Sequence, residues 1–205
     1  MATDTYRIAR RKFEHENNIG KQVLIHFKSV DMLQSLLKKV DADVVCHINK
    51  DKTYINFEFG NIKHTAYLLN EKFYADWRDR IYPEEFKTTV VIDKQKAIEE
   101  IGLLRTFVIK KEKPAFGQSN DPIRFSIKNG NMTIMGSISG KTMTVDIPIE
   151  QKGDDLDSIY LNSTFLLEML KQQDEKMISI NFAGGNRGAV VIGNDDLVLP
   201  IKMDK

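Results

Sequence analysis

Apolar and polar residues follow one repeating order along this chain. Three stretches with apolar side chains at helical spacing each begin at a short polar residue, at Ser29, Asp93 and Asn162. One strand-like run precedes each stretch and three such runs follow it. The helix starts are nearly evenly spaced, so the pattern predicts a module of one strand, one helix and three strands that occurs three times.

The first module extends over residues 22–69, with its helix capped by Ser29. Its strands are expected at residues 22–27, 44–48, 54–59 and 64–69. Before it, residues 4–13 have the character of the last strand of a further module. Because such modules bury their sheets in pairs, an unpaired one would expose a sheet edge and an apolar helix face. We therefore expect two chains to associate through this half, or the half to be mobile.

The second and third modules are complete and adjacent. Their helices start at Asp93 and Ser163, and their strands are expected at residues 86–92, 123–127, 132–138, 142–147, 157–161, 177–182, 189–192 and 197–201. The segment between the first and second modules contains Pro83, which cannot extend a strand ladder. The expected organisation is a half domain at 1–72, a linker at 73–85 and a complete domain at 86–205.

Composition adds limits to this picture. The chain has 205 residues, 41% of them hydrophobic, and its 30 basic and 29 acidic residues give a net charge of +1. Bulk charge therefore provides no reason to bind nucleic acid. The single cysteine, Cys46, excludes an intrachain disulfide and is expected as a small buried hydrophobe. No apolar run reaches the ~18 residues of a membrane span, and no signal peptide is visible, so a cytoplasmic protein is expected.

Candidate catalytic chemistry is scarce in the sequence. The glycine-rich stretch at residues 184–188 is not followed by a lysine and a hydroxyl residue, and a hairpin turn explains it better than a phosphate site. The four histidines are scattered over strands without carboxylates or cysteines at ligand spacing. Helix capping accounts for serines such as Ser29 and Ser163. We expect no enzyme, no metal and no cofactor.

The two ends of the chain carry the most specific motifs. Residues 3–9 read TDTYRIA and residues 197–203 read LVLPIKM. They resemble paired signatures of the bacterial sliding clamp, the beta subunit of DNA polymerase III, which reads T-D-(G/S)-H-R-L-A in its middle domain and ends in a hydrophobic-Met-Pro-(Met/Ile/Val)-Arg-Leu strand. Residues 73–83 are similar to that family's linker, and residues 162–167 (NSTFLL) are similar to its N-x-x-Y-(L/V)-L helix start. All four matches occur in the family's order.

The resemblance implies a fold and a role. The fold would be the α+β DNA-clamp fold, with antiparallel sheets outside and helices inside. Residues 1–72 would be the C-terminal half of the middle domain, 73–85 the interdomain linker and 86–205 the third domain. Family members are non-catalytic accessory subunits of the replicative polymerase that close a homodimeric ring around DNA. A chain with these parts alone is not expected to close that ring by itself.

The resemblance also implies an apolar groove that receives linear motifs from the polymerase III alpha subunit, the clamp loader and repair polymerases. Carried over by position, it would be lined by Thr3, Thr5, Tyr6, Arg7, Ile8, Arg80, Ile81, Asn162, Phe165, Val198, Leu199, Pro200, Ile201, Lys202 and Met203. Considered without the resemblance, the apolar members are better explained as strand core, whereas the resemblance favours the groove. The sequence departs from the family at Tyr6, which replaces histidine, at Thr5 and at Lys202, and it continues for two residues beyond the usual end.

Clamps of this family face double-stranded DNA with basic helix residues and contact its phosphates without reading its sequence. The candidates here are Lys38, Lys39, Lys94, Lys96, Arg105 and Lys171. A solvated helix face explains these residues better, and Glu99 and Glu100 on the second helix support that explanation. A nucleoid-associated, cytoplasmic location would follow from DNA binding.

Two functions stay open at this point. The first is a truncated sliding clamp, a processivity factor with a groove for partner peptides. The second is a stand-alone, clamp-derived peptide-binding or regulatory protein that does not encircle DNA.

Overall fold

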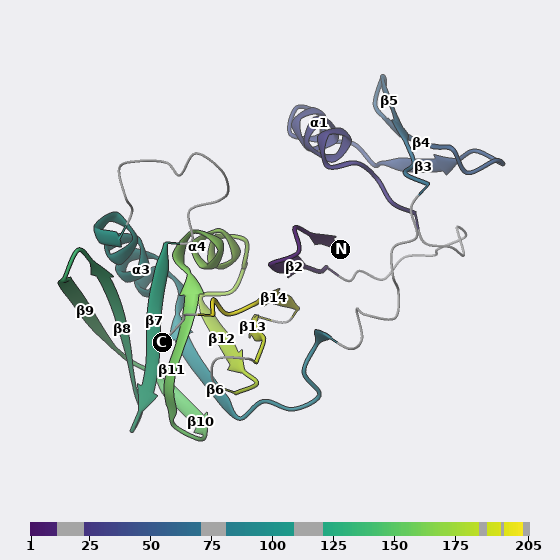
Figure 1. Ribbon diagram of the computed structural model, residues 1–205. Helices are drawn as coiled ribbons and strands as arrows, with labels where there is room; N and C mark the ends of the chain where they lie inside the picture. Colours follow the sequence, from purple (N-terminus) through teal and green to yellow (C-terminus); the bar gives the residue numbers. More distant parts are fainter. Residues whose placement is uncertain (12–22, 71–80, 109–120, 185–187, 194, 203–205) are drawn as a thin grey trace. The chain divides into compact units, whose positions relative to one another are not determined.

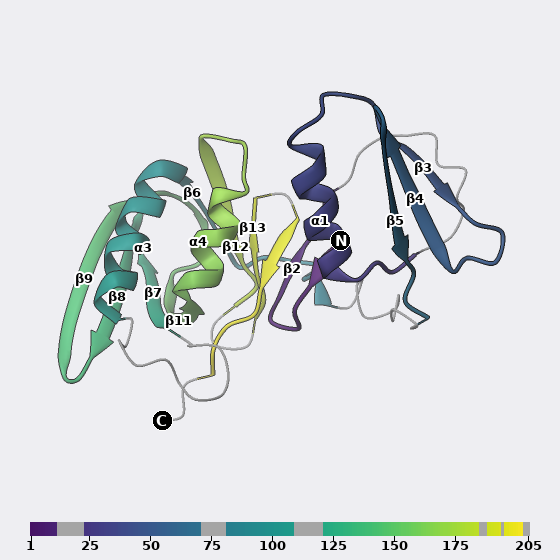
Figure 2. The same cartoon turned by 90° about the horizontal axis from the view of Figure 1, so that it is seen from above.

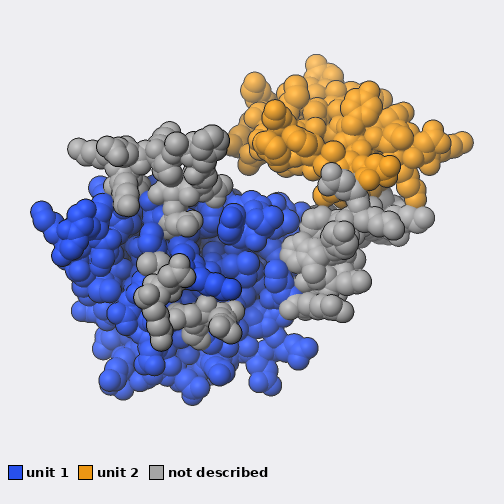
Figure 3. Space-filling model, in the orientation of Figure 1, with its two compact units in different colours: residues 1–12, 77–205 blue, residues 13–76 orange. Residues whose placement is uncertain are grey.

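A computed structural model describes residues 1–11, 23–70, 81–108, 121–184, 188–193 and 195–202 (Figure 1). Contacts divide the chain into two compact units, a larger one of residues 1–12 and 77–205 and a smaller one of residues 13–76 (Figure 3). The first residues of the chain therefore pack with its C-terminal part. The domain boundaries predicted around 72 and 85 stay predictions.

The described residues of the larger unit form two helices and two sheets. Its elements are β1 (Ala2–Thr3), β2 (Arg7–Ala9), β6 (Thr88–Asp93), α3 (Lys94–Val108), β7 (Pro122–Lys128), β8 (Asn131–Ile138), β9 (Lys141–Pro148), β10 (Glu150–Gly153), β11 (Leu156–Asn162), α4 (Ser163–Lys171), β12 (Met177–Phe182), β13 (Val190–Ile192) and β14 (Asp196–Val198). They form a seven-stranded sheet in the order β1-β2-β14-β13-β12-β6-β10 and a four-stranded sheet in the order β11-β7-β8-β9. The described pairings are antiparallel, as predicted.

The two modules of the larger unit exchange their leading strands. β6 precedes α3 but pairs with β12 of the other module, and β11 precedes α4 but pairs with β7. The helices α3 and α4 lie next to each other and cover the sheets (Figure 2). Alternate residues of β7 and β8 are buried against them, as the period of two requires. The exchange places one continuous core beneath both helices.

Most predicted elements of this unit are present within one or two residues, with three differences. In place of the single strand expected at residues 4–13, β1 and β2 form two short antiparallel strands joined by a turn. β10 was not predicted, because its charged sequence lacks strand-like residues; its backbone pairs with β6 from Glu150 to Gly153. The last strand ends at Val198 instead of 201. Beyond it, the Leu199 amide donates to the Tyr6 carbonyl and the Ile201 amide to the Tyr160 carbonyl, so the backbone leaves the ladder.

The smaller unit is one helix on a three-stranded sheet. It consists of α1 (Phe27–Leu37), β3 (Val45–Ile48), β4 (Tyr54–Phe59) and β5 (Ile62–Tyr67), with the sheet in the order β3-β4-β5. Its core combines Ile55, Phe57, Phe59 and Ala66 with partly buried side chains of α1 such as Leu33. The three strands after the helix were predicted correctly to within two residues.

Three predictions for this unit are wrong. Of the expected strand at 22–27, the described residues form only an isolated bridge between Ile25 and Leu68. The helix begins at Phe27, because the cap is His26, whose Nδ1 accepts from the Lys28 amide at 3.3 Å, and not Ser29. Cys46 is exposed and not buried, since it lies on the edge strand β3. Partial burial still raises the pKa of its thiol.

Candidate functional site

The two end motifs of the chain lie side by side in the larger unit. β2 pairs with β14, so that Ile8 is opposite Leu197 and Arg7 is opposite Val198. The Leu199 amide then donates to the Tyr6 carbonyl at 2.9 Å. Residues 3–8 and 197–201 therefore form one ribbon of hydrogen-bonded backbone, although almost the whole chain separates them in sequence.

A tight turn between β1 and β2 displays Tyr6. Asp4 Oδ1 accepts hydrogen bonds from the amides of Tyr6 at 3.1 Å and Arg7 at 3.0 Å, and Thr3 Oγ1 donates to the Arg7 carbonyl at 2.8 Å. Thr5 has a φ of 77°, in the left-handed region that favours glycine. The turn leaves the Tyr6 side chain 58% exposed.

Arg7 connects this turn to α4. Its Nε donates to Asp4 Oδ2 at 2.8 Å, its Nη1 donates to Glu168 Oε2, and its guanidinium lies 4.3 Å from the centre of the Phe165 ring. The Tyr6 ring centre is 6.2 Å from that of Phe165. Desolvation lowers the pKa of Arg7, but the hydrogen bonds that its guanidinium donates to Glu168 and Asp4 outweigh this effect, so the pKa is raised. Arg7 is thus a fixed cation.

The start of α4 is fixed by Asn162. Its Oδ1 accepts from the amides of Thr164 at 2.9 Å and Phe165 at 3.1 Å, which is the N-cap arrangement expected of asparagine. Asn162 is 3% exposed and Phe165 is 8% exposed. Asn162 therefore acts on the candidate groove through the position of Phe165.

The candidate groove residues divide into buried and accessible ones. Ile8 and Val198 are buried, so for these two the strand-core explanation holds. Ile8 packs against Val191 and Leu197, with Ile81 and Leu199 beside them. The accessible members, fully or partly exposed, are Thr3, Thr5, Tyr6, Arg7, Ile81, Leu199, Pro200, Ile201 and Lys202. Arg80 and Met203 lie outside the described residues.

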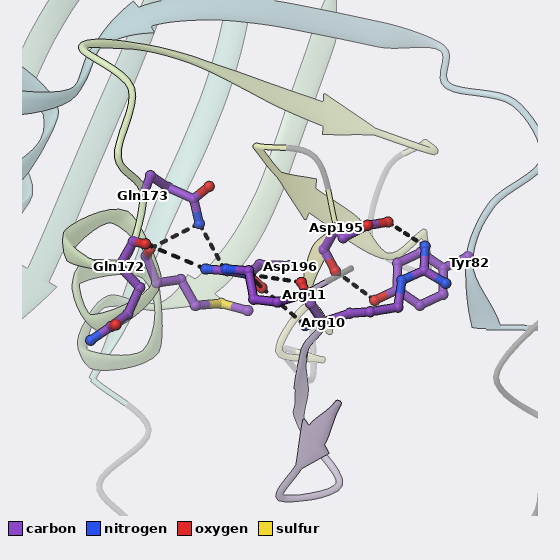
Figure 4. A network of polar contacts seen from close by, with 8 residues as sticks. Arg10, Arg11, Tyr82, Gln172, Gln173, Asp195 and Asp196 are labelled. Carbon is purple, nitrogen blue, oxygen red and sulfur yellow. Dashed lines mark hydrogen bonds and ion pairs between the residues drawn. The ribbon is translucent and has the colours of Figure 1, made fainter. Parts of the chain in front are cut away.

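A polar network that the sequence did not reveal holds this ribbon in place (Figure 4). Arg10 pairs with Asp195, and Arg11 pairs with the buried Asp196. Gln173 Nε2 also donates to Asp196 Oδ2, at 2.7 Å. The hydrogen bonds that Arg11 donates to Asp196 raise the pKa of Arg11, against a smaller opposing effect of desolvation. Two adjacent arginines after one end motif and two aspartates before the other were the only signal in the sequence.

Tyr82 extends the network toward the candidate groove. Its hydroxyl donates to the Asp195 carbonyl at 2.6 Å, and the Arg10 guanidinium lies 4.2 Å from the centre of its ring. Burial raises the pKa of the Tyr82 hydroxyl. Tyr82 thereby holds the part of the predicted linker that the structure describes, from Ile81 onward, next to the candidate groove.

A cavity of about 550 Å³ lies beside Arg7. It is lined by Ala2, Thr3, Asp4, Arg7, Ala9, Arg11, Glu168, Met169, Gln172 and Asp196. Only Thr3 and Arg7 belong also to the predicted groove. Most charged side chains that line this cavity pair with one another. Tyr6 and Leu199 do not line it, so the apolar surface around these two residues is a separate feature.

The six basic residues predicted to face DNA fall into two groups, one that donates hydrogen bonds within the larger unit and one that is exposed. Lys94 Nζ donates to the Gln173 carbonyl at 2.8 Å, and Arg105 Nε donates to Thr164 Oγ1 at 3.0 Å. These two residues connect α3 to α4 and the turn after it. Lys38, Lys39, Lys96 and Lys171 are exposed.

Within the described ranges, no group of metal-binding side chains comes together. No helix of the same ranges has the length and apolar character that a bilayer crossing requires.

Comparison with known proteins agrees with the motifs. Residues 1–74 match the model of the DNA polymerase III beta subunit, central domain. A beta sliding clamp of Staphylococcus epidermidis is 27% identical over 213 residues, covering 98% of this chain and 52% of that protein. One of Streptomyces coelicolor is 25% identical over 198 residues, covering 94% of this chain and 50% of that protein. The chain spans about half the length of these relatives.

Solved structures share the fold. A putative DNA polymerase III beta subunit from Eubacterium rectale has a TM-score of 0.83 at 25% identity and covers 97% of this chain, which corresponds to 52% of that protein. A sliding clamp from Bartonella birtlesii bound to griselimycin has a TM-score of 0.81 at 19% identity, with 98% of this chain and 53% of that protein covered. The predicted α+β clamp fold is confirmed. Residues 1–74 thus match the central domain of the DNA polymerase III beta subunit, and the chain as a whole is similar to the C-terminal portion of bacterial sliding clamps.

Proposed function

We propose that this chain serves as the C-terminal part of a DNA sliding clamp and docks linear peptide motifs of replication and repair proteins. The observation that carries the proposal is the pairing of β2 with β14, which joins the two end motifs beside Phe165. The role is non-catalytic, as an accessory subunit of a DNA polymerase. Double-stranded DNA, the polymerase, the clamp loader and repair polymerases are the partners that the similarity to sliding clamps supports.

The accessible side chains suit an extended peptide. Tyr6, Leu199, Pro200 and Ile201 offer apolar surface next to the fixed cation of Arg7, and Lys202 adds an exposed positive charge. Short apolar anchors in shallow pockets, with direction set by polar groups, are typical of linear-motif recognition. Because several predicted pocket residues are buried, the contact area is modest, and we expect micromolar affinity.

A direct test is binding of a fluorescent peptide with a glutamine followed by leucine and phenylalanine anchors. We expect micromolar binding to the full chain, and a loss of at least about tenfold, ~1.4 kcal/mol, in Tyr6→Ala and Leu199→Ala. Griselimycin, which the Bartonella birtlesii clamp binds, serves as a competitor.

Lys152→Ala is the matched control, because this exposed residue lies on β10 at the opposite edge of the same sheet. Equal binding by all three variants, or no binding by a chain with native circular dichroism, would contradict the proposal.

A further inference from the structure

The larger unit shows how two modules of this family complete each other. Ile92 directly precedes Asp93, the residue before α3, and lies opposite Ile178, the second residue of β12. Leu161 directly precedes Asn162, the cap of α4, and lies opposite Ile123, the second residue of β7. Both second residues are buried, at 2% and 0% exposure. Each module therefore covers the other in the same register.

The smaller unit has the same order of elements without such cover. By position, Ile25 corresponds to Ile92 and Leu161, since it directly precedes the cap His26. Cys46, the second residue of β3, corresponds to the buried Ile178 and Ile123, yet it is exposed. In α1 no residue is buried, whereas α3 buries four residues and α4 six. The exposed apolar side chains of this unit include Phe27, Val30, Met32, Val44 and Val45.

The edge of β3 is suited to accept a strand. Asn49 donates to the Tyr54 carbonyl, so the alternation of an antiparallel pair directs the amides of His47 and Val45 toward β4 and those of Cys46 and Ile48 outward. Cys46 is opposite Phe57, a core residue, so its side chain lies on the core face of the sheet. An added strand would therefore extend both the ladder and the core.

We propose that the smaller units of two copies of this chain pair into one two-module domain. Residues 23–25 of each copy add to β3 of the other copy, with Ile25 opposite Cys46, and the two α1 helices pack together as α3 and α4 do. The pairing is reciprocal, so a two-fold axis satisfies both copies at once. It goes beyond the proposed peptide docking and does not depend on it.

Charge complementarity favours a second copy as the occupant. In the larger unit, the turn before β12 contacts the first turn of α3, where the Lys94 amide donates to the Lys176 carbonyl. The equivalent turn before β3 carries Asp41 and Asp43. It would reach the first turn of the other copy's α1, which contains Lys28 and no acidic residue. Carboxylates at a helix N-terminus and beside a lysine are favourable.

Disulfide trapping in the full chain tests the register. With Ile25→Cys, we expect mild oxidation to join Cys46 of one copy to position 25 of the other, giving a covalent dimer on a non-reducing gel. Directly paired residues in such ladders have Cα atoms about 5.5 Å apart, within disulfide range. Within one copy, β4 and β5 separate the two positions, so the bond cannot form internally.

Two controls make the result specific. Leu24→Cys places the thiol on the next residue, facing the other side of the added strand, and the double variant Ile25→Cys with Cys46→Ser lacks the second thiol; neither should yield the dimer. A dimer in the unaltered chain through Cys46 alone would instead show that two β3 strands pair with each other, and would overturn the proposed register.

Mass measurement by light scattering provides an independent readout. The unaltered chain is expected at twice the 23.5 kDa of one copy, and Cys46→Glu is expected to return it to one copy while its circular dichroism stays native. Lys50→Glu, in the exposed turn after β3, is the matched control and should remain dimeric. A single-copy mass for the unaltered chain over a hundredfold range of concentration would overturn the proposal.

Discussion

At the residue scale, Thr5 and Arg7 define the candidate groove. Arg7 is held by two carboxylates and lies over Phe165, so it cannot reorient without breaking ion pairs. Thr5 adopts a left-handed backbone conformation, with a φ of 77°, that residues with a side chain rarely adopt. The turn that displays Tyr6 is thus fixed by side-chain contacts at the expense of local strain.

Thr5→Gly is expected to stabilise the larger unit. Glycine adopts a φ of 77° without the steric cost of a side chain, and the relief should amount to about 1 kcal/mol. Urea unfolding followed by circular dichroism measures it. Thr144→Gly, at an exposed strand position, should destabilise instead; a loss of stability in Thr5→Gly would show that the turn is not strained.

Asp155 predicts a dependence of stability on acid. Hydrogen bonds from the Gln151 side chain and the Asn129 amide lower the pKa of its carboxyl below the ordinary value of 3.8. A carboxyl whose pKa is lower in the folded state contributes stability above its ordinary pKa and loses it as pH falls through the folded value. Asp155→Asn should therefore lose less stability than the unaltered chain below pH 3.8. Equal acid sensitivity of the two proteins in urea unfolding would contradict this assignment.

At the element scale, α4 links stability to the site. Asn162→Ala removes the cap of α4, and we expect the larger unit to lose about 1 kcal/mol. Because the same cap positions Phe165, peptide affinity should fall as well, although Asn162 is too buried to be a principal contact. Asn162→Asp, which keeps an acceptor, should restore both properties. Loss of stability with unchanged affinity would separate the cap from the groove.

The periodic alternation of apolar and polar residues predicted the elements that have one buried and one exposed face. β4 alternates between buried and partly exposed residues and was predicted over its full length, since its pattern is local. The segment before α1 has strand-like residues as well, but a leading strand in this fold pairs with another module, and pattern alone cannot supply that partner. The charged β10 is held by its backbone and gave no signal.

The candidate site was predictable only through the family resemblance. Pairing of residues 7–8 with 197–198 depends on long-range register, which no local pattern contains. The network of Arg10 and Arg11 with Asp195 and Asp196 was missed for the same reason. Ile8 and Val198 are buried. The sequence could not show whether they belong to the core or line a groove, because either position requires an apolar residue.

At the scale of the whole molecule, the two units differ in completeness. The larger unit has two modules that exchange leading strands and bury a continuous core. The smaller unit has one module with exposed apolar residues on its helix and its edge strand. The chain covers about half of its sliding-clamp relatives, so its action on DNA is a proposal, whereas peptide docking can be tested on the larger unit's own surface.

Hydrogen exchange of the full chain with and without the motif peptide tests the central claim most directly. If the two end motifs form one docking groove, the amides of residues 4–8 and those of Leu199, Ile201 and Lys202 should gain protection together when peptide is added, while β8 and β9 stay unchanged. Protection confined to one of the two segments, or confined to the cavity residues Gln172 and Met169, would contradict a groove built from both ends.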